Sequence, residues 1–306
     1  MNRTMLTREQ IEQYECDGYL VLKDIVSAEI LMRIQQRLEH LVDAYADEML
    51  ASGELSSDYS ELPFDRRWAA IRTEVPAARP VVWRRNLIDK ALYDLWAEPG
   101  ILGAACSILG DEIRAYDLFN GRPREPHDAR QTIGWHQDVS NCPAWDEVDS
   151  RILTFWIPLV PVDEETGCLA VVPGSHRLGR LPFFTNEFGI TGLAKEEEAA
   201  TDDAITVPLE PGDALMFNEL MLHRSLDNLS TRVRWSVDIR FSADSPAHRK
   251  KAPGGFRVCG ADGPEPFDEW VAKWNAQTGV MRRQIRRLDL YAKSLDAAEA
   301  RDVRAY

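Results

Sequence analysis

Apolar positions recur every three or four residues through much of the first 112 residues, which predicts helices in that part of the chain. Thr7 and Gln10 have the spacing of a capping box, and Gly18 is placed to end the helix that they begin. Ser27 is the N-cap expected for a longer amphipathic helix. A short strand is predicted at 19–23 and a polar loop at 51–66. Two further helices are predicted at 88–95 and 100–109.

From residue 113 onward the apolar positions alternate, which is the period of half-buried strands. About eight strands joined by polar turns are typical of a double-stranded β-helix, the cupin-like jelly roll. We expect these strands near 113–119, 132–138, 151–158, 168–172, 205–208, 213–217, 221–225 and 233–241. A helical pattern returns at 264–300.

The pattern therefore predicts a mainly β protein with flanking helices, organised as one domain over 1–306. Its jelly-roll core is expected at about 113–245, between a helical N-terminal part at 1–112 and a helical C-terminal extension at 246–306.

Composition narrows the class of protein. Of the 306 residues 44% are hydrophobic and nine are tryptophan, which is enough for a sizeable core and excludes an intrinsically disordered chain. The formal net charge of −14 argues against a general binder of nucleic acids or anionic membranes, for which a basic surface is expected.

Cysteine usage and the missing hydrophobic segments bear on location. Five cysteines without a CxxC pair fit free thiols in a reducing compartment. The N-terminus lacks the apolar core of a secretion signal, and no stretch approaches the roughly 18 apolar residues of a membrane span. We expect a cytoplasmic protein that does not bind membranes, and its oligomeric state is left open.

Two histidines and an aspartate have the chemistry of a metal site. If residues 135–139 are extended, His136 and Asp138 point to the same face of a strand, with Cα atoms about 6.6 Å apart. His223 can supply a third ligand from a distant strand. Two imidazoles and one carboxylate with open positions opposite are the pattern of non-haem Fe(II) oxygenases. The alternative for either histidine alone is an ordinary core or surface imidazole.

Three sequence blocks support the iron hypothesis. They are Trp135-His136-Gln137-Asp138, then Trp156 followed by Pro161-Val162-Asp163, Gly167 and Pro173-Gly174-Ser175-His176, and finally His223-x-Ser225-x-x-Asn228-x-Ser230-x-x-x-Arg234. In this order and spacing they resemble the phytanoyl-CoA dioxygenase family of Fe(II)/2-oxoglutarate oxygenases, over roughly residues 6–245. The resemblance implies an enzyme that uses Fe(II), 2-oxoglutarate and O₂, with His136, Asp138 and His223 as metal ligands.

The resemblance also implies where 2-oxoglutarate binds. Arg234 matches the family's anchor for the distal carboxylate, a role that suits a planar guanidinium. Arg232 shares its face of the strand and competes for the role, although the family spacing favours Arg234. Ser236 and Ser225 are expected beside that carboxylate. Trp156 matches a tryptophan that flanks the cosubstrate, and core packing is its alternative.

Other polar and aromatic residues receive weaker assignments. Gln137 and His176 are expected to be structural, and Asn228 and Ser230 to satisfy turn backbone. The candidates for facing the substrate, for each of which surface or core packing is the alternative, are Trp135, Asn120, Arg122, Phe183 and Phe184. The long segments 51–66 and 178–204 are candidate lids.

The sequence therefore predicts a dioxygenase that hydroxylates a small molecule and releases succinate and CO₂. An alanine or glycine at 138 would free a position for halide, so Asp138 favours hydroxylation over chlorination. Two alternatives stay open. The same cofactor chemistry can give desaturation, cyclisation or epimerisation, and a jelly roll can persist as a binding protein that has lost catalysis.

Overall fold

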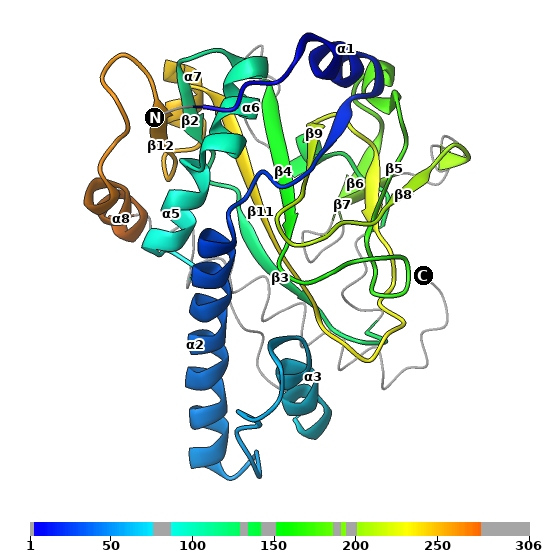
Figure 1. Ribbon diagram of the computed structural model, residues 1–306, viewed down its shortest axis with the longest axis vertical. Coiled ribbons are helices and arrows are strands. Elements are labelled where there is room, and N and C mark those ends of the chain that lie inside the picture. Colours follow the sequence, from blue (N-terminus) through cyan, green and yellow to red (C-terminus); the bar gives the residue numbers. More distant parts are fainter. Residues whose placement is uncertain are drawn as a thin grey trace.

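The computed structural model describes residues 3–75, 87–128, 134–141, 151–185, 191–193 and 201–276. Within these residues, two antiparallel sheets lie at the centre of the molecule (Figure 1). The larger sheet consists of β1 (Tyr19–Leu22), β9 (Ala214–Asn218), β4 (Ile152–Pro158), β11 (Arg234–Ala243), β2 (Ile113–Ala115) and β12 (Phe256–Cys259) in this spatial order, with β3 (Asn120–Arg124) also paired to β11. The smaller sheet has the order β10 (His223–Ser225), β5 (Leu169–Val171) and β8 (Ile205–Val207).

The central strands β4 and β11 have two chemically different faces. On the outer face, Phe155 and Ile239 are fully buried in the same apolar core as the helices. On the inner face, Trp156 packs with Leu169 and Val171 of the smaller sheet. The alternation predicted for 233–241 is therefore present, and its polar members lie between the two sheets, all buried: Arg234, Ser236, Asp238 and Arg240.

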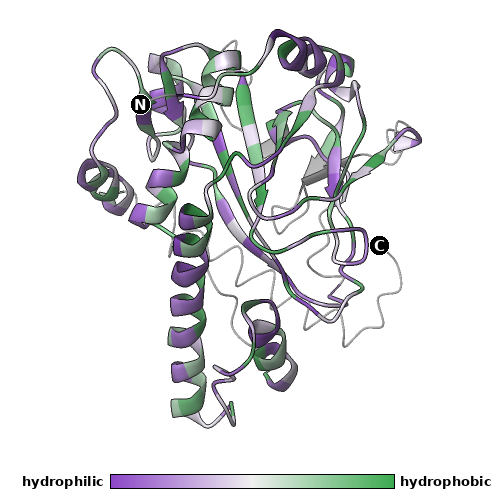
Figure 2. Cartoon of the chain, in the orientation of Figure 1, coloured by the Kyte–Doolittle hydropathy of each residue, from purple (hydrophilic) through white to green (hydrophobic). Residues whose placement is uncertain are grey.

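Most of the helices pack in the apolar core on the outer face of the larger sheet. The described helices are α1 (Arg8–Asp17), α2 (Ala28–Ser52), α3 (Phe64–Glu74), α5 (Lys90–Trp96), α6 (Pro99–Leu109), α7 (Pro246–Lys251) and α8 (Phe267–Ala276). Helix α7 does not join that core, and Ala252 at its C-terminal end packs with Tyr116 and Ile152 in a separate cluster. Polar and apolar bands alternate along the long helix α2 (Figure 2), whose apolar side joins the core through Ile30, Ile34 and Leu38. None of the helices in the described ranges is long and apolar enough to cross a membrane.

The predicted helix starts are confirmed by their hydrogen bonds. The Thr7 side chain accepts from the Gln10 backbone, and the Gln10 side chain accepts from the Thr7 backbone, which completes the capping box of α1. Ser27 caps α2 through the Ile30 N–H. These contacts span three residues, which is why the local sequence predicts them.

Several predicted limits are wrong for tertiary reasons. The predicted strand 113–119 is too long: β2 ends at residue 115 and pairs with the Phe241–Ala243 end of β11, and a separate strand that was not predicted, β3, pairs with the Arg234–Asp238 end. Residues 116–119 connect these positions along β11. The core sheet also takes in β1 and β12, which lie outside the predicted limits of 113–245. Helix α3 begins inside the predicted loop 51–66, and α8 is the described part of the helix predicted at 264–300.

A hairpin of β6 (Phe183–Thr185) and β7 (Thr191–Leu193) lies within the predicted insertion 178–204. Residues 186–190 and 194–200 of that insertion lie outside the described residues.

Gly18 ends α1 and packs closely against the side chain of His176. It ends the helix with φ +80°, and a Cβ atom there would lie 2.3 Å from His176 Nδ1 and 2.6 Å from Met221 Cε. We expect Gly18→Ala to lower the free energy of unfolding by about 2–4 kcal/mol, since a left-handed residue gains a Cβ in a filled space. Urea denaturation measures this loss.

Gly53 provides the matched control, because it ends α2 with φ +74° but nothing lies within 4 Å of its virtual Cβ. Gly53→Ala should cost only the backbone contribution, about 1–2 kcal/mol. Equal losses in the two variants would show that the contact with His176 contributes nothing.

Candidate metal centre

His136, Asp138 and His223 converge between the two sheets. His136 and His223 form an isolated antiparallel bridge, with backbone N–H to carbonyl distances of 3.0 Å in both directions. Asp138 Oδ1 lies 3.9 Å from His136 Nε2 and 4.0 Å from His223 Nε2. One ligand atom from each residue lies within 4.8 Å of the others, and all three side chains are buried. The structure thus brings together the three residues that the sequence singled out.

The local route to this arrangement differs from the predicted strand 132–138. Residues 131–133 lie outside the described part of the chain, and in 134–138 only His136 makes a β-bridge. Asp138 instead begins a 3₁₀ helix, η2 (Asp138–Asn141). The Gln137 side chain points away from the triad, donating to Gly179 O and Leu220 O and accepting from Leu181 N–H. Its predicted structural role agrees with these contacts.

The Asp138 carboxylate is divided between two tasks. Its Oδ2 atom accepts from Arg240 Nε at 2.9 Å, from Arg240 Nη2 at 2.8 Å and from Thr154 Oγ1 at 2.7 Å. Burial raises the pKa of Asp138, but the charge of Arg240 and the neighbouring histidines outweigh burial and hold it below its usual range. Asp138 is therefore ionised, with Oδ1 facing the two imidazoles.

Both imidazoles present a lone pair toward Asp138. His136 Nδ1 lies 2.9 Å from Gly134 O, and His223 Nδ1 lies 2.9 Å from Met221 O. Carbonyl oxygens only accept, so each Nδ1 carries the proton and each Nε2 is a free acceptor. Burial and His223 lower the pKa of His136 to about 3, and burial lowers the pKa of His223. Two neutral imidazole nitrogens and one carboxylate oxygen fit the donor set of a non-haem Fe(II) centre.

Arg234 is hydrogen-bonded to the strand that carries His223 and has an unused donor. Its Nη1 donates to Ser225 Oγ at 2.8 Å and to Gly167 O at 2.9 Å, and its guanidinium lies 5.3 Å from the centroid of the Trp156 ring. Arg234 Nε and Ser236 Oγ are buried without a hydrogen-bond partner among the described residues. Burial, with nearby Arg124 and Arg122, lowers the pKa of Arg234 to about 9, so it remains a cation at neutral pH. These donors suit a carboxylate.

Arg232, the rival of Arg234 in the sequence, is placed differently. Its side chain is 35% exposed and lies 3.9 Å from Asp65 on α3. Asn228 and Ser230 stabilise the turn between β10 and β11. Asn228 Nδ2 donates to Arg124 O and Arg232 O, and Ser230 Oγ donates to Asn228 Oδ1. Their predicted role in the turn agrees with these contacts.

The remaining sequence candidates are spread over several environments. His176 Nε2 bonds to Glu15 O at the end of α1, apart from the triad. Asn120 and Arg122 donate to the two oxygens of Asp238. The aromatic candidates Trp135 and Phe183 each lie 5.0 Å from a guanidinium, of Arg224 and Arg180 respectively. The side chain of Phe184 lies outside the described atoms.

The candidate lid 51–66 is tied to α3 by side-chain hydrogen bonds. Glu74 accepts from the Ser56 backbone and from the Tyr59 hydroxyl, and Arg67 donates to Asp58 O.

Sequence reasoning gave no role to Arg240 and Thr154, although both hold Asp138. Arg240 shares the polar face of β11 with Arg234, and Thr154 is two residues from Trp156 on β4. The period of two on each strand was the available signal. It marks both as inward-facing, but it does not say which of them contacts Asp138.

The chain is similar to known proteins over most of its length. The family model described as phytanoyl-CoA dioxygenase (PhyH) matches residues 14–236. The 1-deoxypentalenic acid 11-beta-hydroxylase of Streptomyces exfoliatus is 30% identical over 259 residues, which cover 79% of this chain and 83% of that enzyme. The enzyme of the same name from Streptomyces arenae is 31% identical over 175 residues, covering 53% of this chain and 60% of its own.

Solved structures share the fold. EctD from S. alaskensis, with 2-oxoglutarate and 5-hydroxyectoine, is 20% identical, with a TM-score of 0.53 over 79% of this chain and 78% of that one. The non-heme alpha ketoglutarate dependent carbocyclase SnoK from nogalamycin biosynthesis is 20% identical, with a TM-score of 0.53 over 79% and 88%. The predicted jelly-roll class with flanking helices is confirmed by this likeness and by the two antiparallel sheets.

Glu219 is a buried acid that the sequence analysis did not single out. It follows β9, its backbone carbonyl accepts from the Val139 N–H in η2 at 3.0 Å, and its Oε2 has no partner among the described residues. Burial raises the pKa of Glu219 to about 8, and the charge of Asp138 acts in the same direction. The carboxyl group is therefore mostly protonated at neutral pH, which spares the site a second buried anion.

This raised pKa predicts a pH-dependent stability. In the unfolded chain the carboxyl titrates near 4.5, so between about 4.5 and 8 unfolding releases its proton and the free energy of unfolding falls as pH rises. Glu219→Gln removes this titration. Urea denaturation at several pH values should show the variant gaining stability relative to the natural protein across that window. A constant difference between the two proteins would contradict the raised pKa.

Proposed function

Because the chain belongs to the phytanoyl-CoA dioxygenase family, it is an Fe(II)- and 2-oxoglutarate-dependent dioxygenase, and we propose that it hydroxylates a small organic molecule. His136, Asp138 and His223 are its proposed iron ligands. The observation that most supports them is the meeting of two Nε2 lone pairs and one free carboxylate oxygen in a buried space.

Bound Fe(II) and 2-oxoglutarate supply the oxidising chemistry, in which O₂ is consumed and succinate and CO₂ are released. The chain supplies the geometry. Arg240 and Thr154 hold Asp138 by one oxygen, so the other oxygen keeps its direction. The carbonyls of Gly134 and Met221 fix the tautomers and ring orientations of the two histidines. One carboxylate and two neutral imidazoles attract a divalent cation and leave the complex a net positive charge, which favours binding of an anionic cosubstrate.

Arg234 is the proposed anchor of the distal carboxylate of 2-oxoglutarate. Ser225 and Gly167 O hold its Nη1, which leaves Nε available to an incoming carboxylate, and the hydroxyl of Ser236 is a further donor two residues along β11. Trp156 lies against the guanidinium and supplies an apolar wall. A dianion in this pocket would offset the cationic charge that Arg122 and Arg124 add near Arg234.

A small-molecule substrate is supported by the relatives, whose names include hydroxylases of 1-deoxypentalenic acid and dioxygenases of ectoine. Asn120 and Arg122 are the proposed substrate-facing residues. Both donate to Asp238 from β3, and the Arg122 side chain is 38% exposed. Their exposure and polarity favour a substrate with a polar or anionic group. The free thiols of Cys16, Cys106, Cys168 and Cys259 support a reducing compartment, for which we propose the cytoplasm.

Other outcomes of the same chemistry depend on which substrate hydrogen faces the metal, so desaturation, cyclisation and epimerisation stay as alternatives to hydroxylation. The combination of the triad and Arg234 argues against a binding protein without catalysis. Burying the charges of Asp138 and Arg234 costs desolvation free energy, and a protein that only binds has no need of a complete metal-ligand set.

Removing any one ligand should abolish 2-oxoglutarate turnover. We expect His136→Ala, Asp138→Ala and His223→Ala to lower succinate formation by more than about 100-fold, the upper end of what loss of an outer partner costs a metal site. Succinate release and bound iron are measured with added Fe(II), and thermal unfolding checks the fold. His40→Ala, on the exposed side of α2, is the control and should match the natural protein. Undiminished succinate formation in any ligand variant would refute the assignment.

The two arginines of the 232–234 segment should respond differently. Arg234→Ala is expected to raise the 2-oxoglutarate concentration for half-maximal succinate release by about 30-fold or more, since losing one side of a buried charge pair costs about 2–5 kcal/mol. Arg232→Ala should change it by less than about fivefold, because Arg232 is paired with Asp65 in a partly exposed ion pair that contributes at most about 1 kcal/mol. Titration of both variants with 2-oxoglutarate decides, and the reverse order of effects would transfer the role to Arg232.

A further inference from the structure

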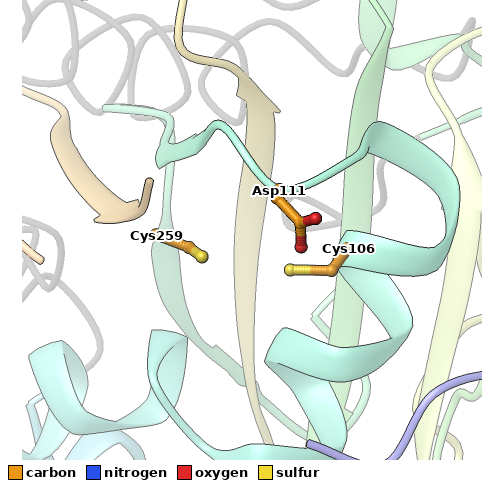
Figure 3. Close-up of side chains that lie close together, drawn as sticks. All are labelled: Cys106, Asp111 and Cys259. Carbon is orange, nitrogen blue, oxygen red and sulfur yellow. The ribbon is translucent and has the colours of Figure 1, made fainter. Parts of the chain in front are cut away.

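A second cluster of metal-binding side chains lies at the edge of the larger sheet. Cys106 comes from the last turn of α6, Asp111 from the connection between α6 and β2, and Cys259 from the end of β12 (Figure 3). One ligand atom of each lies within 4.8 Å of the others. The two thiols are buried, whereas the Asp111 side chain is 84% exposed and opens the cluster to water.

A cation already occupies the focus of this cluster. Arg3 Nη2 lies 2.7 Å from Cys259 Sγ, and Arg3 Nη1 lies 3.3 Å from Cys106 Sγ and 3.1 Å from Asp111 Oδ1. The guanidinium thus contacts all three potential ligands at once. Arg3 precedes α1, and its side chain is 31% exposed, so a rotation of this side chain into solvent would break no bond between strands.

The spacing and the donor types suit a thiophilic divalent ion. At a Zn–S distance of about 2.3 Å, ligand atoms around one tetrahedral ion lie about 3.8 Å apart, so the side chains need to close by at most about 1 Å. Two sulfurs favour Zn²⁺ over Fe(II), Mg²⁺ or Ca²⁺. The iron triad contains no sulfur, and the two clusters share no residue.

We propose that Cys106, Asp111 and Cys259 form a second metal site, which takes Zn²⁺ when Arg3 moves out to solvent. The two sulfurs and one Asp111 oxygen supply three ligands, and water reaches the fourth position past the exposed carboxylate. Each thiol loses its proton on binding, so one ion entering releases two protons. The ion connects the end of α6 to β12, which are far apart in the sequence. Because it binds the folded chain, it should raise the free energy of unfolding.

Co²⁺ is the probe that separates this site from the iron centre. It binds both kinds of site, but only thiolate ligation gives the intense near-ultraviolet charge-transfer band, which the two histidines and Asp138 cannot produce. We expect anaerobic titration of the full, reduced enzyme with Co²⁺ to produce this band and Zn²⁺ to remove it. Cys106→Ser and Cys259→Ser should each lose most of the band while retaining succinate formation. Cys16→Ser, at an exposed single thiol, should keep it.

Two further variants test the site without touching the buried thiols. Asp111→Asn should weaken Co²⁺ binding about 10-fold or more, the scale of losing one partner of a metal site. Arg3→Ala should strengthen it, because the competing cation is gone. These two remain informative if a cysteine variant fails to fold.

Three results would overturn the proposal. They are a band of equal intensity in Cys106→Ser or Cys259→Ser, no band at excess Co²⁺ in the reduced enzyme, and weaker rather than stronger binding in Arg3→Ala. A Cys106–Cys259 disulfide that persists in the presence of reductant, seen by peptide mass analysis, would equally exclude the metal site.

Discussion

The arrangement of the site depends on one buried carboxylate that has a different partner for each oxygen. Arg240 on β11 and Thr154 on β4 are directly opposite each other in the register of these strands, and both donate to Asp138 Oδ2. Because the pairing of the two central strands fixes the positions of Arg240 and Thr154, it also fixes the orientation of the Asp138 carboxylate and the direction in which Oδ1 points. A buried anion without such partners would protonate, and it would then be a poor ligand for a dication.

Positive and negative side chains on the inner face of β11 are paired in one half of the site and not in the other. Asp238 is paired with Arg122 and Arg240, and Asp138 with Arg240, so this half of the face is compensated. Among the described residues, the hydrogen-bond acceptors of Arg234 are neutral: Ser225 Oγ and Gly167 O. Burying a cation in this way is costly unless an anion joins it, so the fold holds a destabilised arginine where 2-oxoglutarate is proposed to bind.

The sheet and the helices need each other to place these groups. The outer face of β4 and β11 packs on α2, α5 and α6, and the inner face packs on the smaller sheet that carries His223. His136 reaches the site only because its backbone bridges to His223, and Asp138 only because η2 turns the chain immediately afterwards. The contact between Val139 and Glu219 fixes that turn from the opposite side. Metal-ligand geometry is thus a property of packed elements rather than of any one strand.

The sequence by itself determined the features that depend on neighbouring residues. The capping box at Thr7 and the cap at Ser27 follow from spacings of three residues, which helix geometry converts directly into contacts. The polar face shared by Arg234 and Arg240 follows from the period of two along one strand. The spacing of two singled out His136 and Asp138, and the order of the three sequence blocks added His223, because these residue types limit the chemistry available to them.

Only the tertiary structure decided how those side chains are used. Arg232 and Arg234 are on the same face of a strand in the sequence, yet Arg232 lies beside Asp65 of α3, whereas Arg234 is buried and hydrogen-bonded to Ser225 of β10. The end of the predicted strand at Asp138, the choice of Arg240 as its partner and the meeting of Cys106 with Cys259 likewise depend on segments far apart in the chain. Periodicity reports which face a residue occupies, whereas the register between distant strands and the packing of helices determine what lies opposite that face.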